Sequence, residues 1–176
     1  MESKGLYRFH EEQRFRQWWL WLLIAAAAGL QWWGFYEQIV QGKPWGNKPA
    51  PDWMMVLLWL GVGNGLPILF YAMRLVVTVT DQEIDIHFRP LIRRRIPIAD
   101  VSDVEARKYS PLVEFGGWGI RGLRGNRAYN ISGRRGVALV LTDGSRVMIG
   151  SRRAEALAEA ITTIRSLRER GDDYRA

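Results

Sequence analysis

The chain has 176 residues, a formal net charge of +7, two histidines and no cysteine. A chain without cysteine has no disulfide, no thiolate nucleophile and no cysteine-bound zinc. The two histidines, His10 and His87, are too far apart in the sequence to indicate a metal site. We therefore expect no metal and no cofactor, and the supply of general bases for catalysis is small.

Two long apolar runs, residues 17–40 and 53–73, indicate a membrane protein. Glu37 is the single charged residue within them. A helix of about 20 residues, rising ~1.5 Å per residue, crosses the ~30 Å hydrocarbon core of a bilayer. We predict two transmembrane helices at these positions, joined by an extracytoplasmic loop at residues 41–52.

Basic residues flank the two runs on the side of the chain termini: Lys4, Arg8, Arg14, Arg16 and Arg74. The connection between the runs has only Lys43 and Lys48. Because basic residues concentrate on the cytoplasmic side of a membrane, we predict that both termini are cytoplasmic. Residues 1–16 form an amphipathic lead-in that is expected to lie on the membrane surface.

Small residues four apart occur in both predicted spans, Ala25 and Gly29 in the first and Gly61 and Gly65 in the second. Such pairs allow helix backbones to approach closely. Each pair begins at a similar depth in its helix, so we expect the two pairs to face each other near the middle of the membrane.

Two polar residues, Gln31 and Asn64, also fall at membrane depth. Polar groups in a bilayer need hydrogen-bond partners. One interpretation is a hydrogen bond between these two side chains, and the other is contact with another membrane subunit.

From residue 75 the apolar pattern changes from helical to alternating, which is typical of strands. Ile84, Ile86 and Phe88 are expected to point inward, and Asp143–Gly144 marks a hairpin turn. An amphipathic helix is predicted after a cap at Ser151. Residues 74–170 are therefore predicted to form a cytoplasmic α+β domain, followed by a tail at residues 171–176.

Two stretches of this domain, residues 96–109 and 116–161, resemble the pleckstrin-homology-like (PH-like) domains of small bacterial membrane proteins. The resemblance implies a bent antiparallel sheet or barrel of seven strands capped by a C-terminal helix, used for docking and not for catalysis. It also implies a multi-pass protein of the bacterial inner membrane. The acidic turn at residues 80–83 departs from the basic loop of phosphoinositide-binding PH domains, so that ligand is not expected there.

A glycine- and arginine-rich segment, residues 115–136, and a basic cluster after Pro90 are the candidate contact surfaces. Their candidate residues are Arg93, Arg94, Arg95, Trp118, Arg121, Arg124, Arg127, Arg134 and Arg135. Three interpretations remain open for the segment: glycine turns between short strands, contact with anionic lipid headgroups, or a protein docking site. For the cluster, charge that protects a strand edge is the alternative to membrane contact.

No nucleophile–base pair, paired-carboxylate site or phosphate loop occurs in the sequence, so catalysis is not expected. Nucleic acid is also a poor candidate, because the domain has many acidic residues. The leading hypothesis is a membrane-anchored scaffold, assembly factor or accessory subunit of a larger inner-membrane complex, with a photosynthetic complex as one specific case. Its expected partners are membrane lipids and other integral membrane subunits. The alternative is a signalling or stress-response protein whose basic domain binds anionic lipid.

Overall fold

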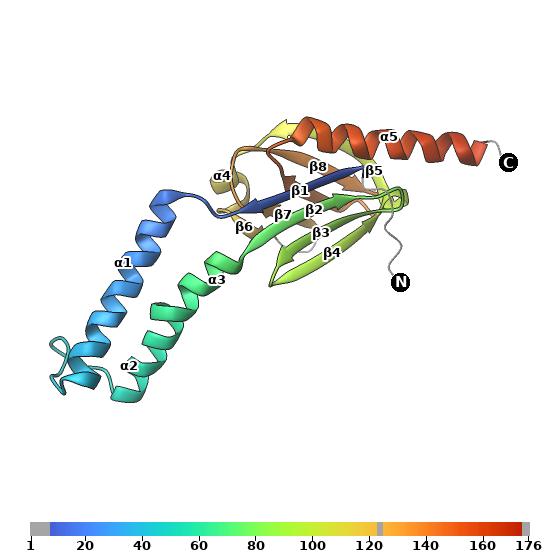
Figure 1. Ribbon diagram of the computed structural model, residues 1–176. Coiled ribbons are helices and arrows are strands. Elements are labelled where there is room, and N and C mark those ends of the chain that lie inside the picture. Colours follow the sequence, from blue (N-terminus) through green and yellow to red (C-terminus); the bar gives the residue numbers. More distant parts are fainter. Residues whose placement is uncertain (1–7, 123–124, 174–176) are drawn as a thin grey trace, which may run out of the picture. The chain divides into compact units, whose positions relative to one another are not determined.

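The computed structural model describes residues 8–122 and 125–173, with side chains as far as residue 170 (Figure 1). The chain is an α+β protein with two sheets and several helices. It divides into two compact units. Phe15–Met73 form a helical unit, whereas Met1–Arg14 and Arg74–Ala176 form a sheet unit.

The helical unit has two long helices that lie side by side and run in opposite directions (Figure 1). The first is α1 (Trp18–Phe35), which continues as a short π-helical segment, η1 (Tyr36–Val40). The second consists of α2 (Asp52–Leu58), the π-helical segment η2 (Trp59–Gly65) and α3 (Leu66–Ala72).

Within the described residues, one helix is long and apolar enough to cross a membrane, Asp52–Ala72 with 21 residues. It corresponds to the second of the two predicted spans. The other helix contains several tryptophans and Gln31, whose polar N–H and amide groups lower its mean hydropathy. The first span therefore stays a prediction.

The first sheet of the sheet unit is antiparallel, with the strand order β1-β2-β3-β4. Its strands are β1 (Phe9–Arg14), β2 (Arg74–Val79), β3 (Glu83–Arg89) and β4 (Ile92–Pro97). Strand β1 corrects the prediction of a separate amphipathic lead-in. Residues 9–14 of the predicted lead-in form a strand instead, in which every second residue is buried.

One face of this sheet forms part of the core. Ile84, Ile86 and Phe88 are buried, which confirms their predicted inward direction, and Leu75 and Val77 of β2 are buried beside them. The opposite face has mostly polar and charged side chains. Half-buried strands of this kind bury one set of alternate residues and solvate the other.

The second sheet has the order β5-β8-β9-β7-β6. It contains β5 (Val101–Lys108), β6 (Gly119–Arg121), β7 (Asn126–Asn130), β8 (Arg135–Leu141) and β9 (Arg146–Gly150). The β7–β9 pair is parallel and its other pairs are antiparallel. A 3-10 turn, η3 (Ile98–Asp100), joins the two sheets. The described residues thus contain nine strands, where the resemblance implies seven.

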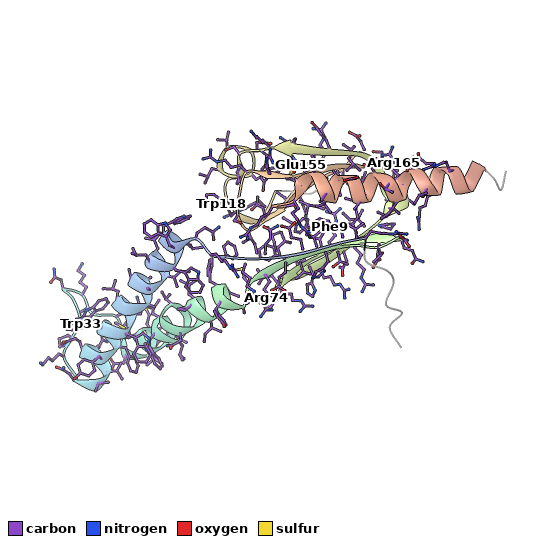
Figure 2. All side chains as sticks on the ribbon, turned by 45° about the horizontal axis from the view of Figure 1, so that its top comes forward. Phe9, Trp33, Arg74, Trp118, Glu155 and Arg165 are labelled. Carbon is purple, nitrogen blue, oxygen red and sulfur yellow. The ribbon has the colours of Figure 1, made fainter. Side chains whose placement is uncertain are left out.

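Helix α5 (Ala154–Asp173), the predicted amphipathic helix, packs on β5 and β8, and its residues Leu157, Ile161 and Ile164 are buried. Its polar side carries Glu155 and Arg165 (Figure 2). The helix begins three residues after Ser151, whose Oγ still accepts a 3.0 Å hydrogen bond from the Arg153 N–H. It also extends into the predicted tail, whose residues 174–176 lie outside the described part. A short helix not predicted from the sequence, α4 (Pro111–Phe115), follows β5.

Candidate functional site

Strand β1 is fixed to the corner between β9 and α5 by buried polar side chains. Glu11 accepts hydrogen bonds from the Ser151 hydroxyl at 2.5 Å and from the Arg152 N–H at 2.9 Å. The Gln13 amide donates to the Gly150 carbonyl at 2.8 Å. Glu11 and Gln13 are 8% and 2% exposed, so both depend on these partners. The contacts join the first sheet to the second.

Arg153 completes this connection. Its guanidinium donates to the His10 carbonyl at 2.6 Å and lies 4.7 Å from the centre of the Phe9 ring, a cation–π distance. Sequence reasoning missed these residues because it treated residues 1–16 as separate from the sheet. Apart from Phe9, the buried residues of β1 are polar, so the sequence had no apolar alternation that could have identified this strand.

The polar face of the first sheet carries a row of arginines at one end. Arg14 lies opposite Arg74, and Arg74 lies opposite Arg89, in three neighbouring strands. Glu12 Oε1 accepts from Arg14 Nε at 2.9 Å and contacts Arg74 Nη1 at 3.4 Å. The Arg14 hydrogen bond, with the positive charge of Arg74, lowers the pKa of Glu12. One carboxylate therefore contacts two of the three arginines, and the row keeps a net positive charge.

Strand alternation divides the predicted cluster Arg93–Arg94–Arg95. Arg93 pairs with Asp85 at 2.7 Å, and Arg95 lies 3.6 Å from Glu83, both on the charged face of the sheet. Arg94 is half-buried and belongs to the opposite face, with Ile92 and Ile96. The cluster is therefore not one continuous basic surface.

Arg94 instead lines an open groove of about 580 Å³ within the sheet unit. The groove brings together β4, the start of β7, the β8–β9 turn and the start of β9. Its lining residues are Arg94, Gly125, Asn126, Arg127, Asp143, Gly144, Ser145 and Arg146. We call it the arginine groove. Arginines from three strands line it, and two of them, Arg94 and Arg127, are predicted candidates.

Asp143 is the acidic residue of the arginine groove. The Ser145 side chain and its N–H, which donates to Asp143 Oδ1 at 2.8 Å, lower the pKa of this carboxyl, and the charge of Arg94 adds to the effect. Arg146 was not predicted. It lies two residues after the Asp143–Gly144 hairpin turn, and that position near a recognised turn was the available signal.

The remaining candidates of the glycine–arginine segment do not meet in one place. Arg121 Nε donates to the Trp118 carbonyl at 3.1 Å, and Arg135 lies 3.1 Å from Glu155. The Arg134 carbonyl accepts from the Tyr109 N–H. Arg124 lies outside the described residues. These arginines therefore have separate local roles.

Turn formation, one of the three interpretations of the segment, is confirmed at its glycines. Gly122 has a φ of +91°, and a Cβ added there would lie 2.0 Å from the Asn126 carbonyl oxygen. A residue with a side chain cannot occupy this position without moving the backbone. Gly116 ends α4 in the left-handed conformation, as is typical of helix C-termini.

In the helical unit, the predicted small-residue contacts are wrong in detail. A Cβ added at Gly29 or Gly61 would meet nothing within 4 Å, and one at Gly65 would be nearest the Leu60 carbonyl of its own chain segment. Ala25 is exposed. The close approach is at Gly63, where an added Cβ would lie 3.2 Å from the Trp59 ring and 3.5 Å from Gln31 Cβ. Bulky tryptophan rings, not backbone contact, occupy the space between the helices.

Asn64 forms a hydrogen bond with Trp59 instead of the predicted one with Gln31. Asn64 donates to the Trp59 carbonyl at 2.9 Å, within the π-helical segment of its own helix. The buried Gln31 Oε1 and Trp59 Nε1 have no hydrogen-bond partner within the described residues. The Trp59 ring stacks on Phe35 and meets Trp32 edge-on. A buried acceptor and a buried donor thus remain available beside Gly63.

In the part of the chain that the structure describes, no group of three or more His, Cys, Asp or Glu side chains could hold a metal ion. The fold and the arginine groove together define an α+β protein with an apolar helical unit and a basic surface site. The chain belongs to a family of unknown function (DUF6141), which matches residues 2–167. No curated protein matches it.

Proposed function

We propose that the protein is a non-catalytic, membrane-anchored module that acts as a scaffold, assembly factor or accessory subunit of a larger membrane complex. The observation that carries this proposal is the apolar surface of the helical unit. Its exposed side chains include Trp18, Leu22, Leu23, Leu30, Trp33, Val40, Trp53, Leu57, Leu60, Ile68 and Tyr71. Surfaces of this kind belong in lipid or against a partner protein, because they are costly in water.

The helix Asp52–Ala72 supports the same proposal. Only 11% of its 18-residue apolar window is buried, so it does not serve as the core helix of a water-soluble fold. The proposal adds the first helix as a second span and places both termini in the cytoplasm of a bacterium. The arginines at the ends of β1 and β2, next to the apolar helices in the sequence, fit the cytoplasmic boundary of a membrane.

Partner contact within the membrane is supported by the unpaired atoms beside Gly63. A buried amide oxygen on Gln31 and a buried indole N–H on Trp59 each cost free energy unless they find a partner. Because both atoms are enclosed by the helical unit, a partner helix would reach them only after the Gln31 and Trp59 side chains change conformation. The proposal uses such a contact to favour an accessory subunit over an isolated anchor, with a photosynthetic complex as one specific case. On the cytoplasmic side, the proposal uses the sheet unit as a PH-like docking module.

The experiment is purification from membranes in mild detergent, with mass spectrometry of the particle. We expect a complex larger than the 20.3 kDa chain that survives high salt. The variant Leu30→Ala, on the exposed apolar surface of the helical unit, should weaken the complex, whereas the matched variant Leu167→Ala, at a similarly exposed position of α5, should do so less. A lone chain under all conditions would contradict the scaffold proposal.

A second candidate function, a signalling or stress-response protein that binds anionic lipid, is favoured by the arginine row. Each basic residue near an anionic membrane contributes about 1 kcal/mol. Arg14, Arg74 and Arg89 share few acidic neighbours. Binding that falls steeply with salt and rises with anionic lipid content would support this function over the first.

A further inference from the structure

We propose that the arginine groove is a binding site for a phosphate group, carried either by a small soluble ligand or by a phospholipid headgroup. The proposal concerns the sheet unit alone and does not depend on membrane anchoring or on a partner complex. It rests on the charge of the groove, on its fixed backbone walls and on the chemistry of its lining.

The charge of the groove is unbalanced. The described residues contain no ion pair between an acidic group and Arg94, Arg127 or Arg146. Arg94 is near enough to Asp143 for its positive charge to help lower the pKa of that carboxyl. The neighbouring Arg93 and Arg95 are paired with Asp85 and Glu83 on the other face of β4. Among the described residues, three arginines and one aspartate therefore line the groove.

The walls of the groove are held in place by backbone hydrogen bonds. The Arg146 N–H donates to the Gly125 carbonyl at 2.7 Å, which fixes the start of β9 to the start of β7. The Gly144 N–H donates to the Leu141 carbonyl at 2.9 Å and closes the β8–β9 turn. These bonds fix the backbone of the strands that carry Arg127 and Arg146, so the walls of the groove need little reorganisation to receive a ligand.

Two glycines lie at the turns that border the groove. Gly125 and Gly144 have φ values of +91° and +78°, and a Cβ added at either would meet nothing within 4 Å. Space at both turns allows a ligand to reach the backbone. The volume of about 580 Å³ exceeds that of a phosphate ion, so the groove can also hold the group to which the phosphate is attached.

The lining selects phosphate over other ligands. Arginine presents a planar fork of N–H donors that matches two phosphate oxygens, and Ser145 and Asn126 add polar groups. Among the described residues, the lining has no aromatic ring to stack on a nucleobase and no Leu, Ile, Val or Met side chain to hold an acyl chain. The ligand is therefore recognised through its phosphate, and the rest of it remains in contact with solvent.

The test uses the full-length chain in detergent, titrated with glycerol 3-phosphate and with inorganic phosphate by calorimetry. Phosphatidic acid and phosphatidylcholine in nanodiscs form the second arm. We expect Arg127→Ala and Arg146→Ala each to weaken binding by about tenfold or more, the range for a lost charge-assisted hydrogen bond. Arg95→Ala removes the same charge from the opposite face and should leave binding unchanged. Asp143→Asn should strengthen binding.

The two arms distinguish the source of the phosphate. Binding of glycerol 3-phosphate in detergent indicates a soluble ligand, whereas binding of phosphatidic acid alone indicates a headgroup; both support the site. Equal losses in Arg95→Ala and Arg146→Ala would overturn it, because they would show only diffuse attraction. Absence of binding in both arms, with each variant folded by circular dichroism, would also overturn it.

Discussion

Arg14 and Arg74 lie directly opposite each other on neighbouring strands, and both contact the same oxygen of Glu12. These two arginines are the last residue of β1 and the first of β2, so the chain leaves the sheet unit and returns to it at one register position. Three residues connect β1 to α1, and Met73 alone connects α3 to β2. The helical unit is thus an insertion between two paired strands.

Glu12 should make the stability of the sheet unit sensitive to acid. Its pKa is lowered by the Arg14 hydrogen bond and the charges of Arg14 and Arg74, from an ordinary value of 4.5. The stabilisation is present above that ordinary value and is lost as the pH falls through the lower pKa of the folded state. Melting temperatures between pH 6 and pH 3 should therefore fall further for the natural chain than for Glu12→Gln. For exposed pairs the difference is about 0.2–1 kcal/mol. Parallel curves would contradict the assignment.

The buried contact between Glu11 and Ser151 should contribute measurably to folding. Ser151→Ala leaves one buried carboxylate oxygen without its hydroxyl donor, and we expect a loss of about 1–3 kcal/mol in the free energy of unfolding. Denaturant titration of the detergent-solubilised chain gives the value. Glu159→Gln, at an exposed position of α5, is the control and should change little. Similar losses in both variants would indicate a general effect on α5.

Gly122 is expected to be the least replaceable glycine of the glycine–arginine segment. Gly122→Ala combines a strained φ with a 2.0 Å clash against the Asn126 carbonyl oxygen. Gly133→Ala has the strain of a φ of +86° without any neighbour within 4 Å. The second variant should cost about 1–2 kcal/mol, and the first clearly more. Equal melting temperatures for the two variants would show that the Gly122 turn can rearrange freely.

Gly63 should be the sensitive small residue of the helical unit. Gly63→Val places new atoms against Trp59 and Gln31, which an added Cβ would already meet at 3.2 and 3.5 Å. Gly29→Val projects into open space and serves as the control. Thermal stability in detergent should fall by about 1–3 kcal/mol for the first variant, the usual cost of overpacking. A greater loss of thermal stability in Gly29→Val would contradict this account and support the predicted close helix contact at Gly29.

The sequence was sufficient for the α+β class and for the inward residues of β3, because alternation of apolar and polar residues identifies half-buried strands. Ile84, Ile86 and Phe88 have the predicted direction. Strand β1 was not recognised because its partner, β2, lies beyond the whole helical unit in the sequence. Pairing over such a distance leaves no local turn signal.

The arginine groove could be predicted only in part. Arg94 and Arg127 were among the candidates as members of two basic segments. That both line the same groove depends on how the two sheets pack, which no local sequence pattern encodes. The prediction of the contacts between the two helices was wrong for a related reason. Spacing identified small residues such as Gly29, whereas the packing of Trp59 and Trp32 determined that Gly63 is the close approach.

Membrane anchoring of the helical unit is the central claim, and labelling of single cysteines in sealed cells tests it most directly. The natural chain has no cysteine, so Asn47→Cys and Leu167→Cys each introduce a unique site. With a membrane-impermeant maleimide, we predict that Asn47→Cys reacts in intact spheroplasts. Leu167→Cys should react only after the membrane is opened. Equal labelling of both sites before and after opening, or release of the chain by an alkaline wash, would contradict the account.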